Sequence, residues 1–193
     1  MVEAARDLFL ARGYPATTVE AISAAADVPQ ATVYRLFGGK HGILSEVLDV
    51  LAVGDDEPVA LHDRPEARAL RDEPDPRRFL AGFAHIARGV LDRTGALQQV
   101  VRTAAAVDPD AADIAAKIDR ERAAGQANVA RGLAARNALR DDMSQDEALD
   151  VIYTLMSPQI HHMLVTERGW APDQYEQWLT RTLCATLLRD TGK

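Results

Sequence analysis

The sequence predicts an all-α protein: an N-terminal three-helix helix-turn-helix domain followed by a larger helical domain. Apolar residues recur at helical spacing along almost the whole chain, and no segment alternates as a strand would. Hydrophobic residues make up 47% of the 193 residues, enough for a substantial core. An acidic, proline-containing segment at 54–65 marks a boundary. We therefore expect one domain over 1–52 and a second over 53–193.

Charge and composition narrow the class of protein. The net charge is −7, from 22 basic and 29 acidic residues, which argues against attraction to nucleic acid through bulk charge. Cys184 is the single cysteine, so the chain cannot form an internal disulfide. No apolar run approaches the roughly 20 residues of a membrane span, and no signal peptide opens the chain. We expect a cytoplasmic protein without a membrane partner.

Four helices are predicted over residues 1–52, namely the three of the helix-turn-helix domain and one that packs behind them. Their expected ranges are 3–12, 18–26, 30–36 and 40–52. Thr17 and Glu20 have the spacing of a capping box at the second helix, with Thr17 as the cap. Pro29 suits the first turn of the third helix. We assign Val28, Val33, Leu36, Phe37, Ile43 and Leu44 to a small core.

The second and third helices have the spacing of a helix-turn-helix, in which the second helix enters the DNA major groove. Hydrogen-bonding and methyl groups at its start suit base edges, and hydroxyl or cationic groups nearby suit phosphates. The expected base-reading residues are Gln30, Ala31, Thr32 and Arg35, and the expected backbone contacts are Thr17, Tyr34 and Lys40. Each also has a purely structural interpretation: Thr17 as a cap, Tyr34 as a packing residue, and Gln30, Arg35 and Lys40 as solvated surface.

Residues 4–51 resemble the DNA-binding domain of TetR-type (TetR/AcrR) transcriptional regulators. The resemblance is carried by "AARDLFLARGYPATTVEAISAAADV" and "ATVYRLFGGKHGIL", including Thr17-Thr18, Thr32-Val33-Tyr34 and Lys40. It adds Thr18 to the DNA-binding set. It also implies a homodimer on a palindromic double-stranded operator, and a repressor released by a small-molecule effector.

The chain departs from the family pattern in and before the motif. Asp27 stands at the usual turn glycine, and Pro29 and Gly39 replace common serines. Family members usually carry a basic segment before the first helix, whereas residues 1–52 hold four basic and six acidic side chains, a net charge of −2. We expect a missing basic segment, modest affinity for DNA, or positive groups concentrated on one face of the dimer.

The second domain is predicted to contain six helices, over 66–73, 76–93, 95–106, 109–138, 145–168 and 173–189. The resemblance implies that the last two form a four-helix bundle with a partner subunit. Both carry apolar stripes, which fit either that interface or an intramolecular core. The stripes are Leu149, Ile152, Tyr153, Met156, Ile160, Met163 and Leu164, and Tyr175, Trp178, Leu179, Leu183, Leu187 and Leu188.

An effector pocket is expected among helices 76–138, closed by the helix over 145–168. Its expected residues are Phe79, Phe83, Ile86, Val101, Arg102, Tyr153, Met156 and His161. The apolar members equally suit simple core. His161 and His162 point about 100° apart on a helix, so we expect no metal site. No nucleophile–base pair or phosphate loop is evident, so we expect neither a cofactor nor an enzyme.

The leading hypothesis is therefore a dimeric, effector-responsive DNA-binding repressor. Two alternatives stay open: a regulator without a small-molecule ligand, and a helical carrier or enzyme whose DNA binding is lost.

Overall fold

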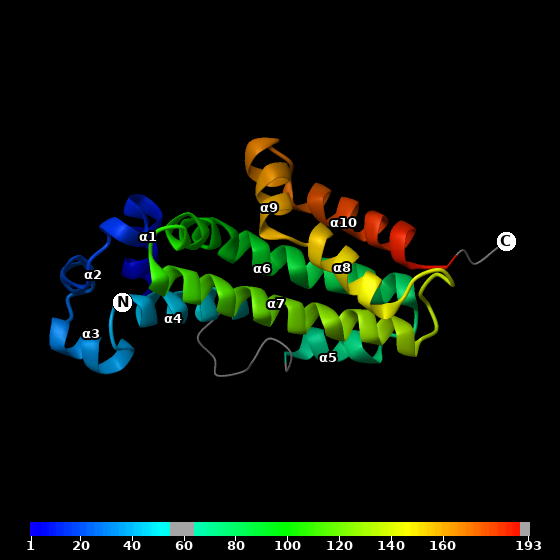
Figure 1. The fold of residues 1–193 in the computed structure, drawn as a ribbon, viewed down its shortest axis with the longest axis horizontal. Helices are drawn as coiled ribbons and strands as arrows, with labels where there is room; N and C mark the ends of the chain where they lie inside the picture. The colour runs from blue at the N-terminus through cyan, green and yellow to red at the C-terminus, as the bar shows by residue number, and fades with distance from the viewer. Residues whose placement is uncertain (55–63, 190–193) are drawn as a thin grey trace. The chain divides into compact units, whose positions relative to one another are not determined.

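The computed structural model describes residues 1–54 and 64–189, which fold into helices without any strand (Figure 1). The all-α prediction is confirmed. Most of the predicted boundary segment, at 55–63, lies outside the described residues. The helices are α1 (Val2–Ala16), α2 (Val19–Ala26), α3 (Gln30–Phe37), α4 (Lys40–Val53), α5 (Pro65–Asp72), α6 (Pro76–Ala105), α7 (Pro109–Ala135), α8 (Gln145–Leu155), α9 (Pro158–His161), the π-helix η2 (His162–Glu167) and α10 (Pro172–Leu187).

The helices form two compact units. The first contains α1–α4 together with residues Arg93–Asp119, which are the end of α6 and the start of α7. The second contains α5, the part of α6 up to Asp92, and the chain from Arg120 onward. The N-terminal helices therefore share their core with residues Arg93–Asp119. The predicted domain over 1–52 did not include these residues.

The first unit is built around one apolar cluster. Its buried residues come from all four N-terminal helices and from α6 and α7: Ala5, Phe9, Tyr14, Val19, Ile22, Val33, Ile43, Leu44, Val47, Leu48, Leu97, Val101, Ala104, Ala111 and Ile114. Val28 and Phe37 pack against it partly buried, as expected. Leu36 was assigned to this core, and that prediction is wrong: its side chain points to solvent and is 57% exposed.

Two glycines shape the first unit. Gly13 has a φ of 75°, which ends the regular part of α1 at the predicted stop and is readily adopted by glycine alone. A final turn then brings Tyr14 into the core, 5.9 Å from the Phe9 ring between centroids. At Gly42, a Cβ atom would lie 1.8 Å from the Phe37 carbonyl oxygen. Only glycine lets α4 pass this close to the end of α3.

The start of α2 differs from the prediction by one residue. Thr18 is the N-cap, and its hydroxyl accepts a hydrogen bond from the Ala21 amide at 3.1 Å. Thr17 is fully buried and donates to the carbonyls of Gly13 and Leu8, at 2.7 and 3.2 Å. The third helical residue is then Ala21 instead of Glu20, so the predicted capping box does not form. The Thr17 hydroxyl bonds to these two carbonyls instead of capping α2. Sequence spacing alone cannot reveal such contacts.

Replacing Thr18 with alanine is expected to destabilise the protein by about 1 kcal/mol, because the Ala21 amide loses its capping partner. Urea denaturation followed by circular dichroism measures the change. Glu20→Gln is the control and should leave the free energy of unfolding within about 0.5 kcal/mol, since Glu20 is exposed and caps nothing. A larger effect from Glu20→Gln than from Thr18→Ala would restore the predicted capping box.

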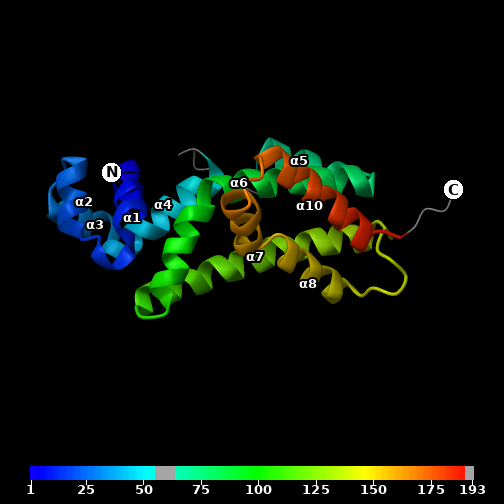
Figure 2. The ribbon, with the colours of Figure 1, turned by 90° about the horizontal axis from the view of Figure 1, so that it is seen from above.

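The second unit packs α5, α8, α9 and α10 with parts of α6 and α7 around its own core (Figures 1 and 2). The largest fully buried side chains there are Leu80, Leu133, Ile152, Tyr175, Leu179 and Leu183. Four of these belong to the stripes expected at a dimer interface. The intramolecular alternative therefore holds for one face of α8 and of α10.

Two predicted helix boundaries in the second domain are wrong. Residues 76–93 and 95–106 form the single helix α6, because Thr94, with Gln98 donating to it at 2.9 Å, is buried inside a continuous helix. The predicted helix over 145–168 is broken after α8. Pro158 lacks an N–H group, and Ser157 restarts the chain as the cap of α9 by accepting from the Ile160 amide.

Candidate nucleic-acid interface and effector-binding region

Helix α3 presents a polar face whose position is fixed from behind by one buried residue. Val33 is fully buried in the core of the first unit. Gln30, Ala31, Tyr34 and Arg35 are exposed, and Tyr34 keeps 53% of its surface accessible. Four of the five sequence-predicted residues of this helix thus lie on its open face, and the fifth, Thr32, is partly buried.

The exposed side chains of α3 are not used by the fold. Within residues 1–54 and 64–189, Gln30, Tyr34 and Arg35 make no side-chain hydrogen bond or ion pair. The turn before α3 is instead held by Asp27, whose φ of 52° ends α2, and by the Ser23 hydroxyl, which donates to the Val28 carbonyl. Hydrogen-bonding groups and a cation are therefore displayed on a rigid helix without an internal partner.

Lys40 lies at the N-terminus of α4 but is engaged within the fold. Its ammonium donates to the Tyr14 carbonyl oxygen at 2.9 Å and lies 4.0 Å from the centre of the Tyr14 ring. The Tyr14 hydroxyl is buried, and burial, with Asp108 and Asp110, raises its pKa to about 12. Lys40 therefore joins α4 to the last turn of α1.

The other end of α4 is also held, by residues that sequence reasoning missed. The Arg93 guanidinium donates to the carbonyls of Leu51 and Ala52, at 2.7 and 2.9 Å. These carbonyls belong to the last turn of α4, where no helical N–H remains to satisfy them. Lys117 pairs with Asp49 at 3.0 Å. An arginine inside a long helix carries no sequence signal of such a cap, because its partner lies about 40 residues away.

The eight predicted effector residues do not form one group. Val101 is buried in the core of the first unit, and Arg102 pairs there with Asp119 at 2.7 Å. Phe79, Phe83, Ile86, Tyr153, Met156 and His161 belong to the second unit. Of these, Phe79 lies under the Arg136 guanidinium, 4.4 Å from its ring centre, where Arg136 also donates to the carbonyls of Arg71 and Glu73.

The second unit contains a polar cluster around three buried side chains, Gln126, His161 and Tyr175, together with the partly buried Arg122 and the exposed Asp92; we call these five residues the buried polar cluster. His161 Nε2 lies 2.9 Å from Asp92 Oδ1, and the His161 ring meets the Tyr175 ring edge-on at 4.9 Å. Arg122 donates to the Tyr153 carbonyl at 3.3 Å, with its guanidinium 4.5 Å from the Tyr153 ring centre. One helical turn further on, Gln126 Nε2 donates to Met156 Sδ at 3.5 Å. Three predicted residues, Tyr153, Met156 and His161, thus surround groups that sequence reasoning did not select.

Tyr175 is the most deeply buried ionisable member of the cluster. Burial raises the pKa of its hydroxyl far above the ordinary value, and the charge of Asp92 raises it further while that of Arg122 lowers it. Its oxygen and the amide oxygen of Gln126 have no hydrogen-bond partner among the described residues. Buried polar atoms of this kind are uncommon and call for an explanation.

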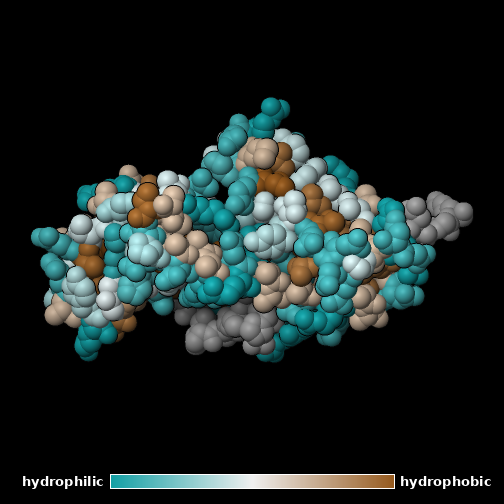
Figure 3. Space-filling model, in the orientation of Figure 1, coloured by the Kyte–Doolittle hydropathy of each residue, from teal (hydrophilic) through white to brown (hydrophobic). Residues whose placement is uncertain are grey.

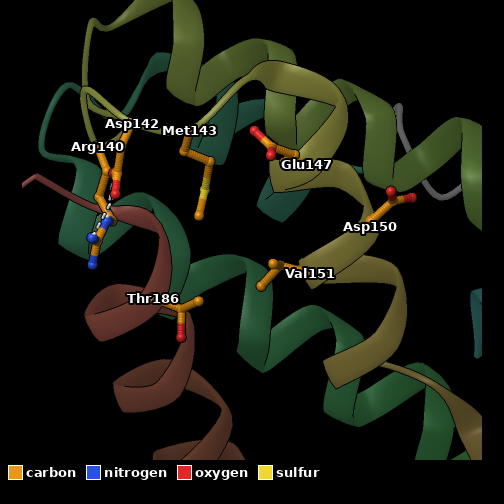
Figure 4. A pocket seen from close by; sticks show the side chains of 7 residues that line it. All are labelled: Arg140, Asp142, Met143, Glu147, Asp150, Val151 and Thr186. Carbon is orange, nitrogen blue, oxygen red and sulfur yellow. Dashed lines mark hydrogen bonds and ion pairs between the residues drawn. The ribbon is translucent and has the colours of Figure 1, made fainter.

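A surface hollow of about 440 Å³ lies elsewhere on the second unit (Figure 4). It is lined by Arg140, Asp142, Met143, Glu147, Asp150, Val151 and Thr186. Arg140 and Asp142 pair across one edge at 3.0 Å, and Glu147 is already held by the Ser144 cap. None of the predicted effector residues lines this hollow.

The described part of the chain offers no group of three or more side chains suited to a metal ion. Within the same ranges, no helix combines the length and the apolar character needed to cross a bilayer.

Residues 1–47 match the family model described as "Bacterial regulatory proteins, tetR family". No curated protein gives a significant sequence match. Solved structures that share the fold include a proposed transcriptional regulator from Saccharomonospora viridis in complex with choline. It is 21% identical, with a TM-score of 0.70, covering 97% of this chain and 95% of that one.

A second structure with the same fold is native NalD of Pseudomonas aeruginosa, the secondary repressor of the MexAB-OprM multidrug efflux pump. It is 21% identical, with a TM-score of 0.70, covering 98% of this chain and 95% of NalD. A third is the fatty acid degradation regulator FadR of Bacillus halodurans, at 12% identity and a TM-score of 0.67, covering 95% and 92% of the two chains. All three of these similar proteins are described as regulators or repressors. Because the likeness spans both units, it confirms the fold of the whole chain.

Proposed function

We propose that the chain is a dimeric transcriptional repressor released from its operator by a small-molecule effector, and the match of residues 1–47 to the model of bacterial regulatory proteins of the tetR family supports this proposal. In this proposal the two predicted domains have different roles. Residues 1–52 bind DNA, and residues 53–193 bind the effector and the partner subunit. The protein acts in the cytoplasm and carries out no catalysis.

The observation that carries this proposal is the open face of α3. Gln30, Tyr34 and Arg35 are exposed and have no internal partner among the described residues, while buried Val33 fixes the helix from behind. Because these groups are exposed on one face of a helix that is fixed from behind, they are available to a partner outside the chain. Gln30, Ala31, Thr32 and Arg35 suit base edges in the major groove, and the Tyr34 hydroxyl suits a phosphate.

Three further residues were predicted to bind DNA, and we assign their roles from their positions in the structure: Thr17, Thr18 and Lys40. Thr18 is exposed at the N-terminus of α2, which suits a phosphate. Thr17 is buried and Lys40 is bonded to Tyr14, so both act on DNA by holding α2, α4 and the end of α1 in place, with the Lys40 charge still near the surface. Thr17 and Lys40 keep their place in the DNA-binding set in this indirect sense.

A homodimer is proposed through the outer surfaces of α8 to α10. Brown, apolar atoms gather over α9 and α10 in Figure 3. Met163 is 48% exposed, and Ile160, Leu164 and Trp178 are only partly buried by the chain itself. Apolar surface of this kind favours association, and two-fold symmetry matches a palindromic operator.

An effector is proposed because regulators with this fold bind small molecules in at least one solved case, the S. viridis protein with choline. The effector must bind the DNA-competent and released states with different affinities, since otherwise nothing would switch. The alternative of a regulator without a small-molecule ligand predicts operator binding that no small molecule weakens. The alternative of a carrier or enzyme predicts a folded protein without operator binding.

The test is binding of the purified protein to the intergenic DNA beside its own gene, titrated with salt. Salt-sensitive binding to a short palindrome supports the proposal, and size-exclusion chromatography with light scattering gives the stoichiometry. A folded protein that binds no DNA, even at low salt and with upstream residues added, would refute it.

Gln30→Ala is expected to change sequence preference at one base pair of each half-site and to weaken the preferred site by about 1–3 kcal/mol per contact. Binding to a set of operators mutated one base pair at a time measures this preference. The control is Lys40→Ala, which should weaken binding to all of these operators alike, because Lys40 positions backbone elements. A Lys40→Ala protein with altered preference, beside a Gln30→Ala protein without it, would reverse the two roles.

A further inference from the structure

We propose that the buried polar cluster of the second unit binds the head group of the effector, and that this head group is an uncharged hydroxyl on an otherwise apolar molecule. This inference rests on the proposed function, in which the second unit binds an effector. The surface hollow of Figure 4 is the weaker candidate, because its charged groups already pair with one another or cap α8.

Two unsatisfied atoms carry the argument. Tyr175 is fully buried and Gln126 is 1% exposed. The Tyr175 hydroxyl and Gln126 Oε1 lack a hydrogen-bond partner among the described residues. Burying a polar group without a partner is costly, and a ligand that supplies the missing bond would remove this cost.

Further contacts place the two atoms in one neighbourhood. Gln126 follows Arg122 by one turn on α7, so both side chains leave the same face of the helix. Arg122 bonds to Tyr153 and Gln126 to Met156, on adjacent turns of α8 and its end. The charges of Arg122 and Asp92 both act on the Tyr175 hydroxyl, and His161 joins Asp92 to the Tyr175 ring.

The chemistry of the two atoms selects a hydroxyl. A ligand hydroxyl donates to the Gln126 oxygen and accepts from the Tyr175 O–H at the same time. A carboxylate has no proton for the Gln126 oxygen, and an ammonium has no lone pair for the Tyr175 proton.

The charges around the site favour an uncharged ligand. Asp92 is paired with His161 at 2.9 Å and with Arg88 at 3.2 Å. The Arg122 guanidinium is placed against the face of the Tyr153 ring. Because the acid and the base are already compensated, an additional buried charge would stay unpaired and be strongly disfavoured.

The remaining neighbours favour an apolar body. Tyr153 and Met156 adjoin the cluster, and the Trp178 ring lies 5.8 Å from that of Tyr175. Thioether and aromatic side chains adapt readily to apolar ligands. His161 lies where α9 (Pro158–His161) continues into the π-helix η2, and π-helical segments are frequent at functional sites.

The experiment is isothermal titration calorimetry of the full chain without DNA. The probes are p-cresol and 1-hexanol, with toluene and p-toluate as comparisons lacking the hydroxyl or carrying a charge. We expect p-cresol to bind at least about tenfold more tightly than either comparison, since each hydrogen bond contributes roughly this factor. Failure of both p-cresol and 1-hexanol to bind would overturn the proposal, as would equal affinity for toluene.

The diagnostic variant is Tyr175→Phe, and its matched control is Tyr14→Phe. Both remove a buried hydroxyl without a partner among the described residues, one from each unit. Tyr175→Phe should weaken p-cresol about tenfold without lowering the melting temperature of the free protein. Tyr14→Phe should leave p-cresol affinity unchanged.

The opposite pattern would overturn the proposal. If Tyr175→Phe lowers the melting temperature and leaves p-cresol affinity unchanged, the hydroxyl serves a buried structural water instead of a ligand. Because DNA is absent from the titration, its result is independent of operator binding. A chain that binds p-cresol by this pattern but binds no operator refutes the proposed repressor and supports the hydroxyl site.

Discussion

Phe9→Ala is expected to lower the free energy of unfolding by about 3–5 kcal/mol. Phe9 is fully buried in the core of the first unit and stacks on Tyr14 at 5.9 Å between ring centres. Removing the ring leaves a cavity between α1 and its neighbours that the packed helices cannot fill. The Gly13–Tyr14 kink also loses its packing surface, so Lys40, which is bonded to the Tyr14 carbonyl, loses a fixed partner. Urea denaturation followed by circular dichroism measures the loss.

The adjacent residue provides the control for this prediction. Leu10 is 44% exposed on the same helix, so Leu10→Ala removes a similar apolar group with little burial. It should change the free energy of unfolding by less than about 0.5 kcal/mol. Equal effects of the two variants would contradict the assignment of Phe9 to the core. Operator binding by Phe9→Ala should fall with the folded fraction, because the α3 face depends on this core.

The helix-turn-helix was predictable because its signals are local. Gly13 ends the regular part of α1, Asp27 takes the left-handed conformation of the turn, and Val33 faces the core while its neighbours face outward. Each follows from a short spacing of residues. The prediction that Leu36 lies in the core is wrong because it used helical spacing alone, which places Leu36 on the same side as Val33. Its actual exposure depends on where α4 passes the end of α3, and the Gly42 contact with Phe37 sets that path.

The candidate effector region was predictable only in part, because its geometry depends on contacts between distant residues. Tyr153, Met156 and His161 lie beside the buried polar cluster, as an inward-facing stripe would suggest. Tyr175 and Gln126 were missed, since nothing in their sequence neighbourhood shows that their oxygens lack partners. Val101 was predicted to line the pocket, whereas α6 is one continuous helix and places Val101 in the core of the first unit.

Helix α4 is held at both ends by contacts within the first unit. Lys40 joins its start to Tyr14, and Arg93 donates to its last carbonyls. These contacts join residues that lie 26 to 42 positions apart, so no local spacing in the sequence could have predicted them.

Arg35→Ala is expected to weaken operator binding by about 30-fold or more. Arg35 is exposed on α3 and makes no ion pair within the described residues, so its guanidinium is free to meet a guanine edge or a phosphate. A dimer loses the contact twice, and each loss costs about 1–3 kcal/mol. Stability should stay within about 0.5 kcal/mol, because no internal contact is removed. Fluorescence anisotropy with a labelled operator, repeated over a range of salt concentrations, measures the affinity.

Arg12→Ala is the matched control, since it removes the same charge from an exposed position on α1 and leaves α3 unchanged. If affinity depended on net charge alone, both variants would weaken binding equally, and that result would contradict a specific role for Arg35. The salt dependence then identifies the contact. Loss of a phosphate contact flattens the slope of log K against log salt by about one unit per subunit, whereas loss of a base contact leaves the slope nearly unchanged and equalises affinity among operator variants. The chain carries few cations on residues 1–52, so each one on the α3 face must contribute strongly if the protein is to bind DNA at all.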